Sequence, residues 1–464
     1  MRKMEKTLFG FAGQKEKQRI ARMEAELPLA LRTIGMMLDM KVPFAQALEA
    51  ASRDGELGSE ISKALREAEG GAGIPRALAS FAERTGSGKL KKAAAQLISA
   101  HEQGSRGSEL RRMAQDLISM QRYEMRDFVS KSALFGLLFV IFAAVIPTFF
   151  LVFATAGKFA LGTEVDPPAF LLAFLILFPA IDALILLVSA SQMPAGIFSA
   201  REEFGKAAGF ALLAIGLAVV MLLDAGIVAR AAGVVLVSGL SWLLFRKDYE
   251  QEARVEKLED ALPDALLGVS GLPKNYGIAK ILAKLAEGSG PLAQEARMAV
   301  RQLSSGIGAE KALADLAGRN SSFMLRRMAR LMLEASLAGA NVSEKMHEMA
   351  EDLLMLGELR RERENALSTQ KYTLLLGSLV VPLILAASLS LVSQLSAFTG
   401  ELATGAGVLE AAPGAIAAYV VIYSALSALY ISHSEGRLSR AVPYFAAMAG
   451  AGLIGFYILA QQFA

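Results

Sequence analysis

The chain has 464 residues, of which 54% are apolar, 20% are charged and none is cysteine. The lack of cysteine excludes disulfides, thiolate metal sites and a cysteine nucleophile. Three scattered histidines, His101, His347 and His433, share no metal-ligand spacing, and a net charge of +3 is too small to indicate a nucleic-acid-binding protein. We expect no metal, no cofactor and no nucleic acid. Apolar and charged residues in these amounts must occupy separate segments.

Residues 1–20 form a basic N-terminal tail without an apolar stretch long enough for a secretory signal, so we expect them to stay in the cytoplasm. Leu8, Phe9 and Phe11 lie among lysines there. Two interpretations remain open: a loose tether, which is the commoner case, or a segment that lies on an anionic membrane surface.

Residues 21–131 predict a soluble module of six short helices. The segment is rich in Ala, Leu, Met, Glu, Lys and Arg and has no alternating β-branched runs. Its last helix carries Leu110, Met113, Leu117 and Met120 at three-four spacing, which is typical of a packing seam and less often of a partner groove. We expect this helix to continue into the membrane. Glycine or proline should break the helices at 40–43, 55–58, 70–73, 85–88 and 104–107.

Seven apolar stretches are long enough to cross a bilayer as helices. The first, between Lys131 and Lys158, holds no charged residue. The third and fourth are separated only by 224–226, which predicts a tight membrane hairpin at Asp224 with Arg230 snorkelling to the surface. The stretches lie in two membrane regions, 132–245 and 372–464, at 132–157, 169–190, 207–223, 227–245, 372–398, 414–431 and 442–459.

Asp182 is an acid within the second span, and intramembrane acids are candidates for function. It could contact the membrane helix of a guest subunit, or it could simply reach water or bond to Ser189 or Ser191. The prolines inside spans should kink them and could shape a groove for a guest helix; they are Pro147, Pro179 and Pro382.

The distribution of Lys and Arg predicts the orientation of the chain in the membrane. An N-terminus inside the cell leaves one lysine in the loops outside and places the C-terminus outside. Both charged regions, 21–131 and 246–371, are then cytoplasmic. The other basic residues on that side are Arg201, Lys206, Arg246, Lys247, Arg437 and Arg440.

The second charged region repeats the first at an offset of about 235 residues, which indicates an internal duplication. Leu27-Pro28 falls on Leu262-Pro263, and Arg84 falls on Arg319. In the second copy the final helix again runs toward a span, through 358–371. Its apolar stripe consists of Val342, Met346, Met349, Leu353 and Leu356.

The second copy carries Gly-x-x-x-x-x-Ala-Leu-x-x-Leu-Ala-x-Arg at 306–319, a basic helix at 325–330, glycine at 339 and Ala-x-Asp-Leu at 350–353. This pattern resembles the F-domain family of type II secretion systems, found in the membrane platform proteins of type IV pili, Tad-like pili and archaella. Seven spans with two F modules resemble the archaeal branch. The first copy departs more, since Pro75 stands where the second copy has Glu310.

The resemblance implies an all-α membrane protein with about seven transmembrane helices and two homologous cytoplasmic helical-bundle modules. It also implies a platform in the cell membrane that is not an enzyme. A cytoplasmic hexameric secretion-type ATPase would dock on the modules and drive prepilin- or archaellin-like subunits from the lipid bilayer into a filament. A homodimer is implied as well.

No motif in the sequence predicts catalysis. Gly86-Ser87-Gly88-Lys89 lacks the first glycine and the Ser or Thr of a phosphate-binding loop, and a helix break explains it. Ser270 is not a nucleophile elbow, because its second glycine falls one place early. The rival hypothesis is a transporter or channel with cytoplasmic regulatory domains. It predicts repeats within the spans and several midplane polar groups, which the sequence does not show.

Basic clusters on matching helices of the two copies are the candidates for ATPase docking. Basic side chains on a cytoplasmic helix more commonly just face water or the anionic leaflet, and that interpretation stays open. Docking on an acidic ATPase surface would use charge complementarity to set the register of the two proteins. The candidate residues are Lys89, Lys91, Lys92, Arg111, Arg112, Arg326, Arg327 and Arg330.

Overall fold

The structure is a computed structural model, and all its regular elements in the described residues are helices, as the sequence predicts. The chain divides into two compact units. Unit 1 contains Met1–Glu124 and Gln251–Glu362, and unit 2 contains Met125–Met193, Ala200–Glu250 and Arg363–Ala464. The described residues are 2–52, 55–104, 107–161, 165–193, 204–222, 227–273, 276–338, 342–399, 406–435 and 437–462.

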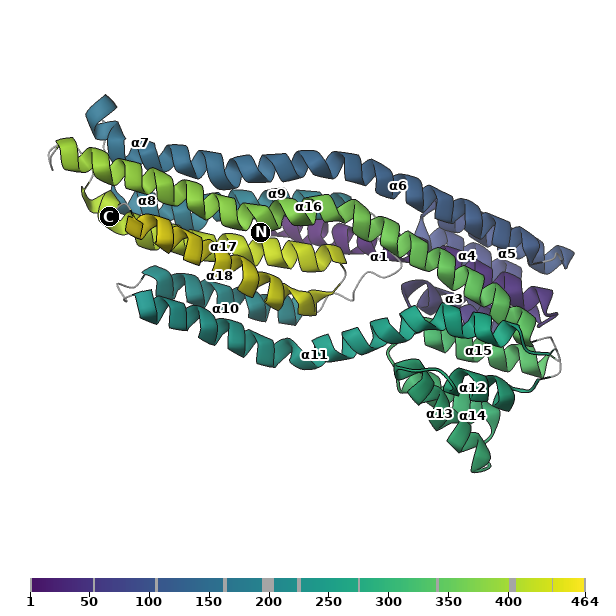
Figure 1. Ribbon diagram of the computed structural model, residues 1–464. Helices are drawn as coiled ribbons and strands as arrows, with labels where there is room; N and C mark the ends of the chain where they lie inside the picture. The colour runs from purple at the N-terminus through teal and green to yellow at the C-terminus, as the bar shows by residue number, and fades with distance from the viewer. Residues whose placement is uncertain are drawn as a thin grey trace. The chain divides into compact units, whose positions relative to one another are not determined.

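The first copy of the module has the six helices that the sequence predicts (Figure 1). A short π-helical segment, Ala68–Ala72, precedes the fourth of them. Residues 1–20, expected to be a tail, belong to the first helix from residue 2 onward. The helices are α1 (Arg2–Asp39), α2 (Phe44–Ala51), α3 (Gly55–Glu67), α4 (Ile74–Thr85), α5 (Gly88–Gln103) and α6 (Ser108–Val140).

The second copy repeats this order of six helices, and α2 to α5 match α12 to α15 in turn. The long helices α6, α11 and α16 each contribute residues to both units. A helix that begins in a module therefore continues into an apolar span, as predicted. The helices of the second copy are α11 (Ile227–Ser270), α12 (Ile278–Ala286), α13 (Pro291–Ser304), α14 (Ala309–Gly318), α15 (Phe323–Leu337) and α16 (Val342–Thr399).

The break predicted at 55–58 is wrong, because α3 begins at Gly55 and continues through Gly58. The carboxylate of Glu26 on α1 accepts the backbone N–H groups of Glu56 and Leu57 at 3.3 and 2.9 Å. These groups are among the four that a helix N-terminus leaves without an intrahelical partner. A side chain on another helix thus supplies the start signal, which local sequence cannot reveal.

The two copies share one hydrophobic core within unit 1. The stripe of the second copy is core: Met346 and Met349 are fully buried. In the first copy Leu110 is buried but Met120 is 48% exposed, so that stripe is only partly covered. Gly107 allows the closest backbone approach, since a Cβ there would lie 1.8 Å from the carbonyl oxygen of Gly35.

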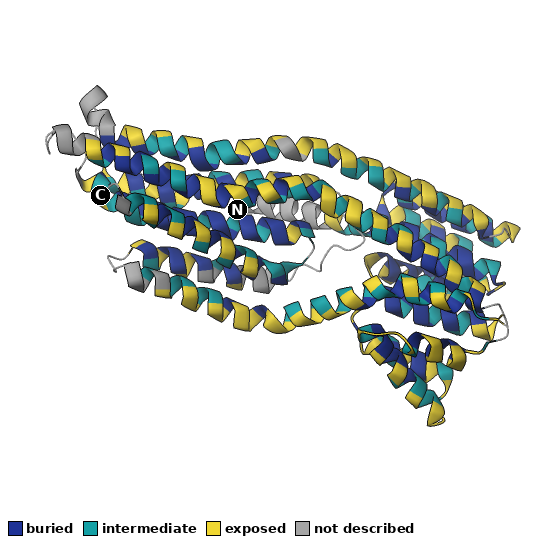
Figure 2. Ribbon diagram, viewed as in Figure 1, coloured by how far each residue is buried: buried dark blue, intermediate teal, exposed yellow. Residues whose placement is uncertain are grey.

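Unit 2 is organised around α17, which packs against α7 to α10 and α18. Figure 2 shows buried residues along most of α17, and Tyr419 and Tyr423 are its largest buried side chains. Arg230 on α11, expected to snorkel, donates to the Tyr457 hydroxyl at 3.0 Å. The remaining helices are α7 (Ile146–Leu161), α8 (Pro167–Leu172), α9 (Phe178–Gln192), α10 (Phe204–Leu222), α17 (Ala406–Glu435) and α18 (Ala441–Gln462).

Among the described residues, five helices are long and apolar enough to cross a membrane, and Gly209–Leu222 is a shorter apolar helix. The fourth expected span, 227–245, begins α11 but is not one of the five. The hairpin expected at Asp224 lies outside the described residues. Many large apolar side chains on these helices are exposed, among them Phe149 and Leu391, as lipid-facing residues should be.

Two prolines predicted to kink spans each follow a π-helical segment. Ile141–Val145 precedes Pro147, and Ala173–Leu177 precedes Pro179. Proline has no N–H, so the carbonyl four residues earlier loses its partner and the helix must adjust locally. For Pro147 that carbonyl belongs to Ala143.

Candidate functional site

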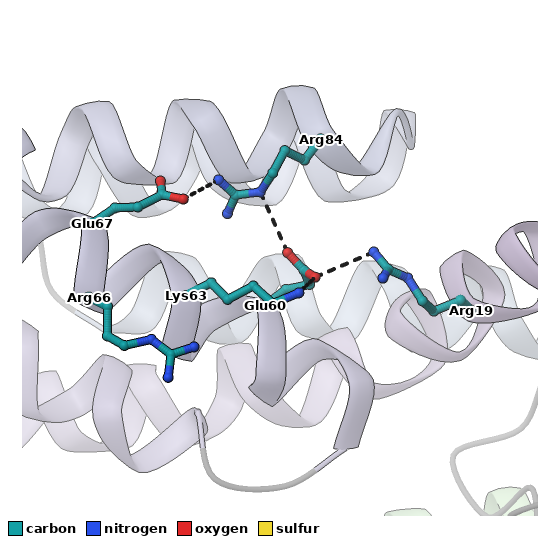
Figure 3. A pocket seen from close by; sticks show the side chains of 6 residues that line it. All are labelled: Arg19, Glu60, Lys63, Arg66, Glu67 and Arg84. Carbon is teal, nitrogen blue, oxygen red and sulfur yellow. Dashed lines mark hydrogen bonds and ion pairs between the residues drawn. The ribbon is translucent and has the colours of Figure 1, made fainter.

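Three helices of the first copy are joined by a buried carboxylate. Glu60 on α3 is only 3% exposed. Its carboxylate accepts hydrogen bonds from Arg19 of α1 at 3.4 Å and from Lys63 at 2.6 Å, and it forms an ion pair with Arg84 of α4 at 3.6 Å (Figure 3). Burial tends to raise the pKa of Glu60, but the hydrogen bond from Lys63 and the neighbouring cations outweigh it and lower this pKa. The carboxylate therefore stays ionised and clamps the three helices.

The second copy repeats this clamp at the same offset of 235 residues. Glu295 on α13 is 2% exposed and accepts Arg254 of α11 at 3.0 Å and Arg319 of α14 at 2.9 Å. The sequence comparison found only the Arg84 and Arg319 match. The whole Arg–Glu–Arg spacing recurs in both copies and could have been found the same way. We call each set an Arg–Glu clamp.

The Gly86 to Lys89 fragment is a helix boundary, as predicted. Ser87 caps α5 by accepting the Leu90 N–H, and its own hydroxyl donates to Glu24 at 2.6 Å. Ser322 does the same in the second copy, where its hydroxyl donates to Glu259 at 2.7 Å. Burial raises the pKa of Glu259, against that hydrogen bond. Both copies thus tie the start of their fifth helix to their first.

The basic candidates on α5 divide into one paired and two free residues. Lys89 bonds to Glu124 at 2.7 Å and to Glu24 at 3.4 Å. Burial lowers its pKa, but these acids outweigh burial and raise it. Lys91 and Lys92 are exposed, and in the described part of the chain neither side chain has a partner. Among the described residues of α5, Lys91 and Lys92 are therefore the lysines whose charge is not shared with an acid.

The candidates on α15 lie mostly inside unit 1. Arg327 is 6% exposed and donates to Asp352 of α16 at 3.1 Å, while Arg32 of α1 reaches the other oxygen of Asp352 at 2.7 Å. Burial lowers the pKa of Arg327, and Asp352 opposes this shift. Arg330 donates to the carbonyl of Ala50. Arg326 is half-buried.

These contacts place the second copy against the first. Arg32 and Ala50 belong to the first copy, and Asp352 and Arg330 to the second. We call Arg32, Asp352 and Arg327 the buried latch. Its arginines are therefore less accessible to a partner than the sequence suggests.

The two candidate arginines on α6, Arg111 and Arg112, also differ in whether they have a partner. Arg111 bridges Asp39 at 2.8 Å and Glu348 at 3.1 Å, the latter on α16, so it too joins the copies. Arg112 is exposed and has no side-chain partner in the described residues. Gln96 of α5 donates to Glu109 of α6 at 3.0 Å, so these helices lie side by side. Lys91, Lys92 and Arg112 hence form a set of accessible cations on adjacent helices, which we call the α5–α6 basic face.

Asp182 is fully buried in unit 2. The hydroxyl of Tyr419 lies 2.8 Å from one of its carboxyl oxygens and 3.0 Å from the carbonyl of Ala143, which Pro147 leaves without a helical donor. The other carboxyl oxygen has no hydrogen-bond partner among the described residues. Asp182 bonds to Tyr419 on α17 and not to Ser189 or Ser191, a partner that no local pattern predicts.

These features define a class of protein: a multi-span helical membrane protein that carries a duplicated, charged helical module. The model of the family Type II secretion system (T2SS), protein F matches residues 30–156 and 270–389, which together exceed half of the chain. The chain belongs to this family, whose members are membrane platform proteins of secretion and pilus systems. Each match covers a module and the span that follows it. No curated protein and no solved structure matches the chain in the same comparisons.

Proposed function

We propose that the chain is the plasma-membrane platform of a type IV pilus-like machine, on which a cytoplasmic hexameric ATPase docks. ATPase action would then move prepilin- or archaellin-like subunits from the bilayer into a filament. The family match over both copies carries this proposal. The helices α6 and α16 support it, because each holds module residues and span residues in one continuous helix. The platform itself would bind no nucleotide.

The proposal includes the topology predicted from basic residues, with the N-terminus and both modules in the cytoplasm and the C-terminus outside. It also includes a homodimer, since a motor with six-fold symmetry matches a platform of lower rotational symmetry. Among the predicted docking residues, the α5–α6 basic face is favoured, because Lys91, Lys92 and Arg112 are exposed and unpaired in the described residues.

Charge reversal on the α5–α6 basic face tests the docking proposal. Lys91→Glu/Lys92→Glu should reduce co-purification of the secretion-type ATPase about tenfold or more, because the new charges repel an acidic surface. Arg76→Glu/Lys311→Glu is the matched control. Both of its sites are exposed and unpaired in the described residues, but they lie on α4 and α14. Equal ATPase recovery with both variants would refute docking on this face.

Asp182 stays a proposed contact for a subunit's membrane helix. Its side chain is enclosed and bonded to Tyr419, so a guest helix would reach it only if α9 and α17 moved apart. A cysteine crosslinking scan of α9 against a subunit during filament assembly tests this. Crosslinks near Asp182 are expected, and crosslinks confined to the lipid-facing side of α9 would refute the contact.

A further inference from the structure

An open hollow of about 670 Å³ lies in the first copy beside the Arg–Glu clamp. Side chains from α1, α3 and α4 line it, and all of them are charged (Figure 3). Within the described part of the chain, neither an apolar residue nor a glycine belongs to the lining. The lining residues are Arg19, Glu60, Lys63, Arg66, Glu67 and Arg84.

Positive charge is in excess in this hollow, since four basic residues face two carboxylates. Glu60 is buried and already accepts three of the cations. Glu67 pairs with Arg84 and with no other residue that the structure describes. Arg66 on the last turn of α3 is exposed, and no partner for it exists among the described residues. Its guanidinium has all its donors available to an incoming anion.

The second copy shows which of these features the duplication has kept. Arg301, on the last turn of α13, takes the place of Arg66 and is likewise exposed without a partner in the described residues. Met298 replaces Lys63, and Gln302 replaces Glu67. Both copies therefore retain a clamp with one unpaired arginine next to it. The clamp explains the buried glutamate, but it does not include the arginine, for which the described residues of either module offer no side-chain partner.

We propose that this hollow, formed by the clamp and Arg66, binds an acidic segment of a polypeptide partner. A carboxylate matches the planar fork of Arg66, which can donate two parallel hydrogen bonds. A second carboxylate would take Lys63, which is 46% exposed. The exposed Arg84–Glu67 pair contributes little to stability and can exchange Glu67 for a partner's acid at small cost.

The open shape of the hollow favours a polypeptide over a small anionic molecule. Small-molecule sites enclose most of the ligand surface with apolar walls and a few polar groups. This site is lined by six charged residues, through both their aliphatic stems and their polar ends, and is exposed at Lys63 and Arg66. Such surfaces accelerate association and orient a partner of opposite charge. The inference is independent of ATPase docking, because it concerns α1, α3 and α4 and not the α5–α6 basic face.

Fluorescence anisotropy with a labelled peptide of about ten glutamates tests the inference on the full-length protein in detergent at low salt, where charge pairing is least screened. Arg66→Glu should weaken binding about tenfold or more. Arg76→Glu is the matched control, since Arg76 is exposed, lacks a partner in the described residues and lies on α4 away from the hollow. It should change binding by less than about twofold.

Three results would overturn the proposal. One is that the wild-type protein does not bind the peptide. Another is that Arg66→Glu and Arg76→Glu weaken binding equally, because binding would then follow net charge alone. The third is that inorganic phosphate or ATP displaces the peptide well below the concentration at which sodium chloride of equal ionic strength does so, since the site would then select a small anion.

Discussion

The buried acid Glu60 makes the stability of the first copy depend on pH. It is held by Arg19, Lys63 and Arg84, and its pKa is lowered in the folded protein because these cations outweigh burial. A lowered folded pKa means that the ionised clamp stabilises the fold above the ordinary glutamate pKa. This contribution is lost as the pH falls through the folded value.

Glu60→Gln should therefore destabilise unit 1 at neutral pH, by about 1–2 kcal/mol, because three partly exposed cations lose the carboxylate that they share. The wild-type protein should lose more stability than this variant as the pH falls from about 5 to about 3, through and below the ordinary glutamate pKa. Thermal unfolding in detergent at several pH values measures both effects. Glu83→Gln, at an exposed site on α4, is the control. Parallel pH profiles for wild type and Glu60→Gln would contradict the role given to the clamp.

The buried latch makes a second prediction. Asp352→Ala leaves Arg327 as an uncompensated buried charge and should cost about 3–5 kcal/mol. Replacing Arg327 and Asp352 with apolar residues, as in Arg327→Met/Asp352→Leu, should recover most of that loss, because the fully buried charge is gone and only the half-buried Arg32 loses its partner. Unfolding temperatures of the three proteins provide the test, with exposed Asp116→Ala as the control. A double variant as unstable as Asp352→Ala would contradict this explanation.

At the scale of elements, α9 and α17 are joined to the first span by one hydroxyl. Tyr419 approaches both Asp182 and the carbonyl of Ala143, which Pro147 leaves without a helical donor. Tyr419→Phe should lower the stability of unit 2 by about 1–2 kcal/mol, since the one hydroxyl hydrogen that lies near both acceptors is then lost. A thermal unfolding shift measures it. Tyr123→Phe, at a residue 73% exposed, should have no effect, and equal shifts would refute the assignment.

The number and order of the module helices follow from sequence because glycine and proline mark most boundaries. The start of α3 does not, because Glu26 caps it from another helix. The residues of the candidate site were predicted as basic clusters, but only packing separates exposed Lys92 from buried Arg327. Periodicity at these positions is similar in both copies. What differs is which face the other copy covers, and that contact is not local in sequence.

At the scale of the whole molecule, duplication has produced two modules with different outer surfaces. Both keep an Arg–Glu clamp and a serine cap tied to the first helix. In the first copy the α5–α6 basic face is exposed. In the second copy Arg327, which corresponds to Lys92, is buried and bonded to Asp352 in the buried latch. This difference is the reason that the proposed contact with the ATPase is placed on the first copy. In sequence, by contrast, it is the second copy that matches the family pattern more fully.

The most direct test of the platform account is site-specific photocrosslinking in the native cell, with a crosslinking amino acid at Lys92 and a matched one at Lys311. Both positions are exposed and unpaired in the described residues. The account predicts that Lys92 crosslinks to a secretion-type ATPase, identified by mass spectrometry, and that Lys311 does so far less. Crosslinks at Lys92 to lipid or to other proteins, with no ATPase among them, would contradict it.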